Sequence, residues 1–563
     1  MAINQSAINQ TLSNATTALL DARDARGVWV GELSSSALST AVTIFALHLH
    51  GEHATLVDAG RDWLLANRNS DGGWGDTTRS KSNISTTTLC HAALHAIGIR
   101  DEPSRAWLMR EIGSLEPAAW SEAIADRYGA DRTFSVPILT MAALAGVLGG
   151  DGFAYVKQLP FELAAFPRSW FAELRLPVVS YALPALIAIG QVRHVHRSTR
   201  NFFARLVRDF ASGPTRKTLR EIQPSSGGYL EATPLTAFVV MSLVAAGHRE
   251  HAVVRDGVEF LINSFRADGS VAIDTNLATW VTTLSISALA QQPSGLAEVD
   301  CSAVCDWLLG QQYREVHSYT NSPPGGFAWT DLPGGVPDAD DTSGALLALH
   351  ALGCDEIDAV EAAVRWLIDL QNRDGGVPTF CRGWGKLPFD RSSTDITAHA
   401  IRAWRVWRSR VSAKLQQRID RATGRAKAYL KNEQTAVGQW MPLWFGNEDH
   451  PENRNPAYGT ARVTLAFEEN DQLRRQASQT MIDLSQQVQS IEELALIVRS
   501  LPIECDAMEP AVNRLIELTD GGSSFPASPI GFYFANLWYS ERLYPLIWTV
   551  EALGYARANS DQP

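Results

Sequence analysis

Residues 325–350 read GGFAWTDLPGGVPDADDTSGALLALH, and the second half of this stretch decides the fold. Pro337 disfavours helix at the residue before it, and Asp338 is a good N-cap, so a helix is predicted to begin here. Asp340 and Asp341 then lie in its first turn, where the helix dipole favours negative charge. The apolar residues that follow have helical periodicity, so the stretch predicts a loop that enters a helix.

The same stretch holds three carboxyl groups within four residues. Burying them together is costly, and the like charges raise the pKa of at least one carboxyl group. One interpretation is a carboxylic acid that is kept protonated so that it can donate its proton. The alternative is a capped helix start whose acids are solvated.

A second group of residues, Asp395-Ile396-Thr397-Ala398-His399, precedes another apolar, helix-like run. Residues four apart on a helix face the same way, so Asp395 is predicted to hold and charge His399. A protonated imidazole beside an aspartic acid stabilises the conjugate base and strengthens that acid. The two motifs together indicate an acid and its activator, although an isolated pair at this spacing is usually a surface contact.

These residues resemble the squalene–hopene cyclases, which belong to the class II, protonation-initiated terpene cyclases. The family's Asp-x-Asp-Asp-Thr motif corresponds to Asp338, Asp340, Asp341 and Thr342, and its Asp-Val-Thr-Ala-His motif to residues 395–399. The resemblance implies that Asp340 protonates a terminal alkene. It further implies that Asp338 and Asp341 support Asp340, that His399 and Asp395 sharpen its acidity, and that Tyr458 belongs to the catalytic group.

Helix-ending motifs recur along the chain. Each motif has an aromatic residue followed by leucine, in most copies then a glutamine, and ends in a glycine turn. The last four motifs begin at Phe260, Trp307, Trp366 and Tyr429. Repetition at 47 to 63 residues predicts helix pairs arranged in a solenoid or a closed ring. The resemblance identifies them as QW repeats with the glutamines Gln311, Gln371 and Gln434. Several copies are degenerate: Arg68 stands in place of a glutamine, and Val377 stands in place of a tryptophan. We therefore interpret the repeat residues as structural.

The predicted fold is all-α, with two (α/α) toroid domains built from these repeats. By resemblance, residues 1–30 pack on the second domain, and residues 31–265 form an inserted first α/α barrel with possible membrane-facing helices. Residues 266–563 form the second, (α/α)6 toroid, which carries the acid motif. No long segment alternates with the period of a strand.

Composition limits the partners. The net charge of -12 argues against nucleic acid and against electrostatic adsorption on an acidic membrane. Met1 to Gln10 is unlike a signal peptide, and six scattered cysteines suggest a reducing cytoplasm. No metal or cofactor is predicted. The resemblance implies peripheral or monotopic attachment to the cytoplasmic face of the cell membrane, and a homodimer is possible.

Residues 176–190 are uncharged and include Pro177 and Pro184. A spanning helix needs about 20 apolar residues, so this segment is too short to cross a bilayer. One interpretation is a core helix of the toroid, and the other is attachment to one leaflet.

The resemblance also implies a cavity whose aromatic walls stabilise carbocations through their ring quadrupoles. The candidate substrate-binding residues are Tyr181, Trp280, Trp329, Phe380, Trp384, Trp440, Trp444, Phe445, Phe532, Phe534 and Trp538.

Three functions compete. The leading hypothesis is a cyclase of squalene or a similar uncharged polyprene, which isomerises or hydrates it to a polycyclic triterpene. A magnesium-dependent class II cyclase of a prenyl diphosphate is the alternative, although the sequence shows no compelling lysine–arginine cluster for the diphosphate. A non-catalytic helical-repeat protein that binds a lipid or a partner is disfavoured by the intact Asp340 and His399.

Overall fold

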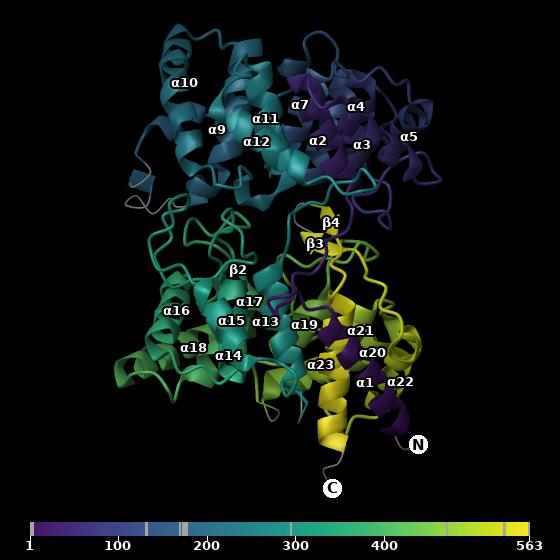
Figure 1. The fold of residues 1–563 in the computed structure, drawn as a ribbon, viewed down its shortest axis with the longest axis vertical. Coiled ribbons are helices and arrows are strands. Elements are labelled where there is room, and N and C mark those ends of the chain that lie inside the picture. The colour runs from purple at the N-terminus through teal and green to yellow at the C-terminus, as the bar shows by residue number, and fades with distance from the viewer. Residues whose placement is uncertain are drawn as a thin grey trace.

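The computed structural model describes residues 5–129, 133–167, 170–171, 178–292, 295–468, 471–532 and 536–560. Its regular structure is helical apart from two short hairpins, and the described residues form two lobes stacked along the long axis (Figure 1). The all-α prediction is confirmed.

Helices of the first lobe are α2 (Ala37–His50), α3 (Ala54–Ala66), α4 (Ile84–Ala96), α5 (Glu102–Ile112), α6 (Pro117–Tyr128), α7 (Ser135–Leu144), α9 (Val178–His196), α10 (Phe202–Ile222), α11 (Thr233–Ala245) and α12 (Ala252–Asn263). Short 3-10 helices are η1 (Gly152–Ala154), η2 (Phe161–Ala165) and η3 (Tyr229–Glu231). The core of this lobe is a closed ring in which α2, α4, α7, α9 and α11 each pack against the next, and α11 packs against α2.

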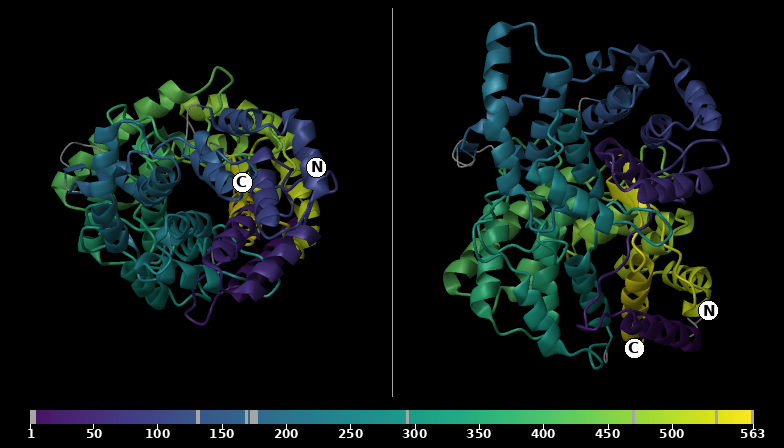
Figure 2. Two further views of the ribbon diagram at one scale, coloured as in Figure 1. Left: turned by 90° about the horizontal axis from the view of Figure 1, so that it is seen from above. Right: turned by 45° about the horizontal axis from the view of Figure 1, so that its top comes forward.

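Helices of the second lobe are α1 (Gln5–Asp21), α13 (Ala278–Leu289), α14 (Cys301–Gly310), α15 (Ala339–Ala351), α16 (Ile357–Leu370), α17 (Thr394–Trp407), α18 (Ala413–Glu433), α19 (Pro456–Thr464), α20 (Gln472–Gln487), α21 (Ile491–Ser500), α22 (Met508–Leu518) and α23 (Tyr544–Ser560), with η4 (Asp520–Gly522). Its inner ring runs α13, α15, α17, α19, α21, α23 and closes by contact of α23 with α13. The other helices lie outside, and from above the helices are arranged around a ring (Figure 2). The predicted toroids are confirmed.

Two antiparallel hairpins lie at the ends of loops. β1 (Val377–Pro378) pairs with β2 (Ser392–Ser393), and β3 (Ile530–Phe532) pairs with β4 (Leu537–Tyr539). The Trp538 backbone N–H of β4 donates a 2.8 Å hydrogen bond to Asp76 of the first lobe. This hairpin therefore joins the two lobes.

Each lobe has its own hydrophobic core. One buried cluster contains residues of 37–261 with a few from later loops, and the other contains residues of 8–33 together with residues of 272–556. The N-terminal helix α1 packs against α23. We propose the domain boundaries at residues 30 and 265 on this basis.

The repeats are held together by glutamine side chains. Gln371 donates to the carbonyl oxygens of Gly375 (2.7 Å) and Ala422 (2.9 Å), and Gln434 donates to those of Gly438 and Leu473. Gln223 and Gln312 make the equivalent pair of bonds in two further repeats. The prediction of Gln311 was therefore wrong by one residue, because Gln311 bonds back to Trp307 within its own helix.

Threonines of the inner helices fix the register of each repeat. The backbone N–H groups of Phe327, Val377 and Trp440 donate to the Oγ1 atoms of Thr342, Thr397 and Thr460 at 2.8 to 3.1 Å. Trp29 donates to Thr282 in the same way. The residues two positions before these threonines consequently occupy equivalent places on neighbouring inner helices: Trp280, Asp340, Asp395 and Tyr458.

The uncharged segment 176–190 belongs to α9, apart from residues 176 and 177, which lie outside the described residues. Ile187, Ala188 and Ile189 are fully buried, so the core-helix interpretation is correct for this part of the segment. Among the described residues, none of the helices has both the length and the hydropathy needed to cross a bilayer.

Candidate active site

The acid motif stands at the start of α15, as predicted. Asp338 is the N-cap, and its Oδ1 accepts hydrogen bonds of 2.9 Å from the backbone N–H groups of both Asp340 and Asp341. The Asp338 and Asp341 side chains are buried, whereas Asp340 keeps 17% of its side chain exposed. Two of the three carboxyl groups are therefore buried, and the third, that of Asp340, is accessible to a substrate.

Burial favours the protonated forms of the two inner carboxyl groups. It raises the pKa of Asp338 to about 7, even though Asp341 and two backbone N–H groups donate to it. Burial and the nearby charge of Asp338 raise the pKa of Asp341 well above its usual value. We infer that a proton on Asp341 bonds to Asp338, because two ionised carboxylates could not share this dry space.

His399 of α17 faces Asp340 directly, with 2.6 Å between its Nδ1 atom and Oδ1 of Asp340. Burial lowers the pKa of His399, and the contact with Asp340 opposes that effect. Asp395 was predicted to hold His399, but its carboxylate instead accepts a hydrogen bond from the Ser393 hydroxyl. Burial, with a smaller effect from the charge of Asp340, raises the pKa of Asp395 to about 6.

The acid cavity is defined by Trp280, Asp340, Asp395, His399, Arg402, Tyr458 and Arg462. Its volume of about 10 Å³ is close to what one water molecule needs. The four threonine-aligned residues all reach this cavity, which explains how residues far apart in sequence form one site.

Arg402 and Arg462 are cavity residues that sequence reasoning missed. The Arg462 guanidinium lies over the rings of Tyr458 (5.4 Å) and Trp548 (5.5 Å). Arg402 is one helical turn after His399, and Arg462 follows Thr460 by two residues. Their helical spacing from the recognised motifs was the available signal.

An aromatic cluster lies between the lobes and consists of Tyr181, Trp329, Phe380, Phe389 and Trp444. The ring centroid of Phe380 lies 5.2 Å from Tyr181, 5.8 Å from Trp444 and 5.9 Å from Phe389. Trp329 lies edge-on to Phe380 at 6.4 Å. Four of these residues were predicted, and Phe389 was not.

Other predicted aromatic residues have different places. Phe445 stacks on Tyr458 at 4.5 Å and so supports the acid cavity from behind. Trp384 is 55% exposed in the loop between Phe380 and Phe389. Trp440 is fully buried and its Nε1 donates to the Leu430 carbonyl oxygen (2.7 Å), which is a repeat contact. A substrate-binding role of Trp384 and Trp440 stays a prediction, and these contacts give it no support.

The remaining predictions fall near the β3–β4 hairpin. Trp538 is buried at the junction of the lobes, and we interpret it as structural. The backbone of Phe532 lies in β3, but its side chain and the whole of Phe534 lie outside the described residues.

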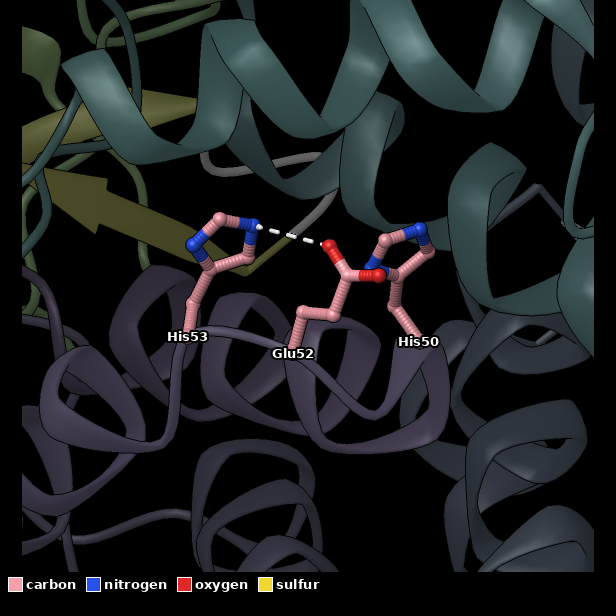
Figure 3. A group of neighbouring side chains, drawn as sticks. All are labelled: His50, Glu52 and His53. Carbon is pink, nitrogen blue, oxygen red and sulfur yellow. Dashed lines mark ion pairs between the residues drawn. The ribbon is translucent and has the colours of Figure 1, made fainter.

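A possible metal-binding group lies away from this site, between α2 and α3 (Figure 3). The ligand atoms of His50, Glu52 and His53 lie within 4.8 Å of one another. Glu52 is exposed, however, and already pairs with Arg249 at 2.9 Å. Because this guanidinium would repel a metal ion, we assign no metal site to these residues.

Comparison with known proteins gives the family. The model of the squalene-hopene cyclase N-terminal domain matches residues 12–189, and that of the C-terminal domain matches residues 276–492. The squalene hopane cyclase afumA of Aspergillus fumigatus is 24% identical, over 78% of this chain and 70% of that protein. The squalene–hopene cyclase of Zymomonas mobilis is 25% identical, over 78% of this chain and 75% of that protein.

The chain spans less than two-fifths of two longer relatives. It covers 38% of the terpene cyclase-glycosyl transferase fusion protein fsoA of Humicola fuscoatra, at 26% identity over 78% of this chain. It covers 39% of the enfumafungin synthase efuA of Hormonema carpetanum, at 24% identity over 81% of this chain.

Among solved structures, ent-copalyl diphosphate synthase from Streptomyces platensis has the same fold, with a TM-score of 0.60 and 17% identity over 97% of this chain and 98% of that one. The two family models, which together match more than half of the sequence, show that this chain belongs to the squalene–hopene cyclase family.

Proposed function

We propose that this protein is a class II terpene cyclase that acts on squalene or a similar uncharged polyprene, with Asp340 as the proton donor. The observation that carries the proposal is the 2.6 Å contact between Asp340 and His399 in a cavity that Trp280 and Tyr458 also line. A partly exposed acid backed by an imidazole and two buried carboxyl groups is suited to donating a proton rather than to fixing a helix start.

The reaction begins when the Asp340 O–H proton is transferred to a terminal alkene. The π electrons form the new C–H bond, a tertiary cation remains, and further alkenes of the substrate attack it in turn. The charge left on Asp340 is stabilised when His399 is protonated, since Nδ1–H then donates to Oδ1. The final cation is quenched by loss of a proton or capture of water, which gives a polycyclic triterpene.

The aromatic cluster suits the rest of this reaction. Ring faces stabilise a passing cation by about 2 kcal/mol or more when water is absent, and they do not capture it. Because the acid cavity has a volume of only about 10 Å³, the site must open before the proposed substrate can reach Asp340. The segment that carries Phe380 and Phe389 is the part we expect to move.

Product formation with and without magnesium tests the substrate class. Squalene and the farnesyl and geranylgeranyl diphosphates are each incubated in EDTA and with added Mg²⁺, and the products are identified by mass spectrometry. We expect squalene to be cyclised equally in both, since an uncharged substrate needs no metal to balance phosphate charge. Magnesium-dependent cyclisation of a diphosphate, with squalene unchanged, would instead establish the alternative function.

We also propose attachment to the cytoplasmic face of the membrane, through a different surface from the one considered in the sequence. Helix α10 exposes Phe202, Phe203, Leu206, Val207 and Phe210 along one side, with Phe203 at 76% and Phe210 at 74%. Leu163 and Phe166, in and just after the adjoining η2, extend this apolar patch. Contiguous exposed apolar groups of this kind mark interaction surfaces, and the proposed substrate dissolves in lipid.

Replacing Phe203 and Phe210 together by serine is expected to release the protein from lipid vesicles, because both rings would otherwise be buried among acyl chains. Co-sedimentation measures the bound fraction, which should resist high salt in the unmodified protein, because salt screens only charge contacts. Val437→Ser is the matched control, since Val437 is 65% exposed on the other lobe. Release by salt alone would contradict attachment through this patch.

A homodimer stays a prediction.

A further inference from the structure

A large cavity opens at the C-terminal ends of the inner helices of the second lobe, at the opposite end of the ring from the acid motif. Its volume is about 980 Å³, and we call it the lower chamber. Its charged and polar lining includes Gln291, His350, Arg402, Arg405, Glu468, Arg474, Arg499 and Tyr555. Four arginines therefore gather in one cavity of a chain whose net charge is -12.

Carboxylates offset only part of this charge. Arg499 pairs with the buried Glu551 at 3.4 Å, and Arg405 pairs with the exposed Glu468 at 3.6 Å. Arg405 and Arg474 also donate to carbonyl oxygens at the end of α19 and just beyond it, as basic residues near helix C-termini commonly do. Arg405, Arg474 and Arg499 therefore each have a partner within the protein, and Arg499 also donates to Gln291 at 3.2 Å.

Arg402 is not explained in this way. Within the part of the chain that the structure describes, its side chain has no carboxylate at ion-pair distance and no hydrogen bond to protein. Burial lowers the pKa of Arg402 to about 9, and Glu551 only partly offsets the neighbouring Arg462, Arg499 and Arg405. The Arg402 side chain is only partly buried and lines both the acid cavity and the lower chamber, so its guanidinium can be reached by an anion.

We propose that the lower chamber binds a phosphate-type oxyanion carrying two or more negative charges, with Arg402 and Arg499 as its principal contacts. Guanidinium groups match phosphate oxygens with paired hydrogen bonds, which favours this class over a halide. The chamber lies toward the C-terminal end of α23, whereas the apolar patch of α10 lies at the other end of the molecule (Figure 1). The anion is therefore taken from solution and not from a lipid headgroup. This site does not depend on the proposed cyclase activity.

Isothermal titration of the full chain with inorganic phosphate and inorganic diphosphate, at constant ionic strength set with sodium chloride, tests the site. We expect saturable diphosphate binding that Arg402→Gln weakens about tenfold or more, since a hydrogen bond to a charged group is lost. Arg408→Gln is the control, because it removes the same charge at the C-cap of the same helix, where Arg408 pairs with the exposed Asp420. Equal affinity in the two variants, or no saturable binding to the unmodified protein, would overturn the proposal.

Thermal unfolding supplies a second measurement that also monitors folding. Without added phosphate, Arg402→Gln should unfold at the same temperature as the unmodified protein or higher, because it removes a charge that lacks a partner. Diphosphate should raise the unfolding temperature of the unmodified protein and of Arg408→Gln but not of Arg402→Gln, since a ligand stabilises only the folded state that binds it. An equal rise in all three proteins would place the anion elsewhere and refute the assignment.

Discussion

Asp340→Asn is expected to abolish cyclisation, with a loss of about 10⁴-fold or more in turnover. An amide of nearly the same shape occupies the place of the carboxyl group but cannot protonate an alkene. The helix start should survive, because Asp338 is the N-cap and accepts from the backbone N–H of residue 340 rather than from its side chain. Turnover is measured by mass spectrometry of the product, and folding by thermal unfolding.

Asp358→Asn is the matched control for this substitution. Asp358 also lies in the first turn of an α-helix, but it is exposed on the outer helix α16. This variant should keep full activity. Asp338→Asn and Asp341→Asn should also reduce turnover, by amounts that differ between the two variants, since these residues support Asp340 without donating its proton. Near-normal turnover by Asp340→Asn would show that another group is the acid.

His399→Ala is expected to slow initiation by about 10²–10⁴-fold, because the conjugate base of Asp340 loses its partner. Single-turnover formation of product is the appropriate measurement, since it separates initiation from release. His95→Ala, an exposed histidine in the last turn of α4, is the control and should be silent. An unchanged rate in His399→Ala would leave this histidine as a packing residue.

The rate is also expected to depend on pH, because His399 gains and loses its proton in the range studied. The active form needs protons on both Asp340 and His399, because a neutral Nδ1 would accept the very proton that the alkene must receive. Burial lowers the pKa of His399 below 6.5, so the imidazolium is formed only as the pH falls. The rate should therefore rise from pH 8 to below about 6.5, and His399→Ala should reduce this rise, leaving the part that reports Asp338, whose pKa is about 7. Asp395→Asn should have a smaller effect, because Asp395 bonds to Ser393.

The sequence predicted the acid motif well because its signals are local. A proline, an N-cap and first-turn acids act within a few residues of one another, and α15 begins where they indicate. Local signals alone could not place the partner of His399, although the family resemblance implied that His399 sharpens the acidity of Asp340. Spacing along one helix favoured Asp395, whereas the structure brings Asp340 from a neighbouring helix, 59 residues away in the chain.

The sequence also could not separate the roles of aromatic residues that lie close together in the chain. Trp440 and Trp444 are four apart, yet one makes a repeat contact inside the lobe and the other joins the cluster between the lobes. Composition cannot separate these roles, because both residues are apolar and largely enclosed. Arg402 and Arg462 were missed for a related reason, since a buried arginine looks like a surface charge until the neighbouring inner helices are in place.

The threonine contacts of the inner helices separate the scaffold from the chemistry. Each contact joins a backbone N–H group to Thr282, Thr342, Thr397 or Thr460, so it does not depend on the side chain two positions earlier. An indole, two carboxyl groups and a phenol already occupy those four places. Single substitutions at these four positions can therefore change the chemistry of the site while the backbone of the toroid keeps its structure.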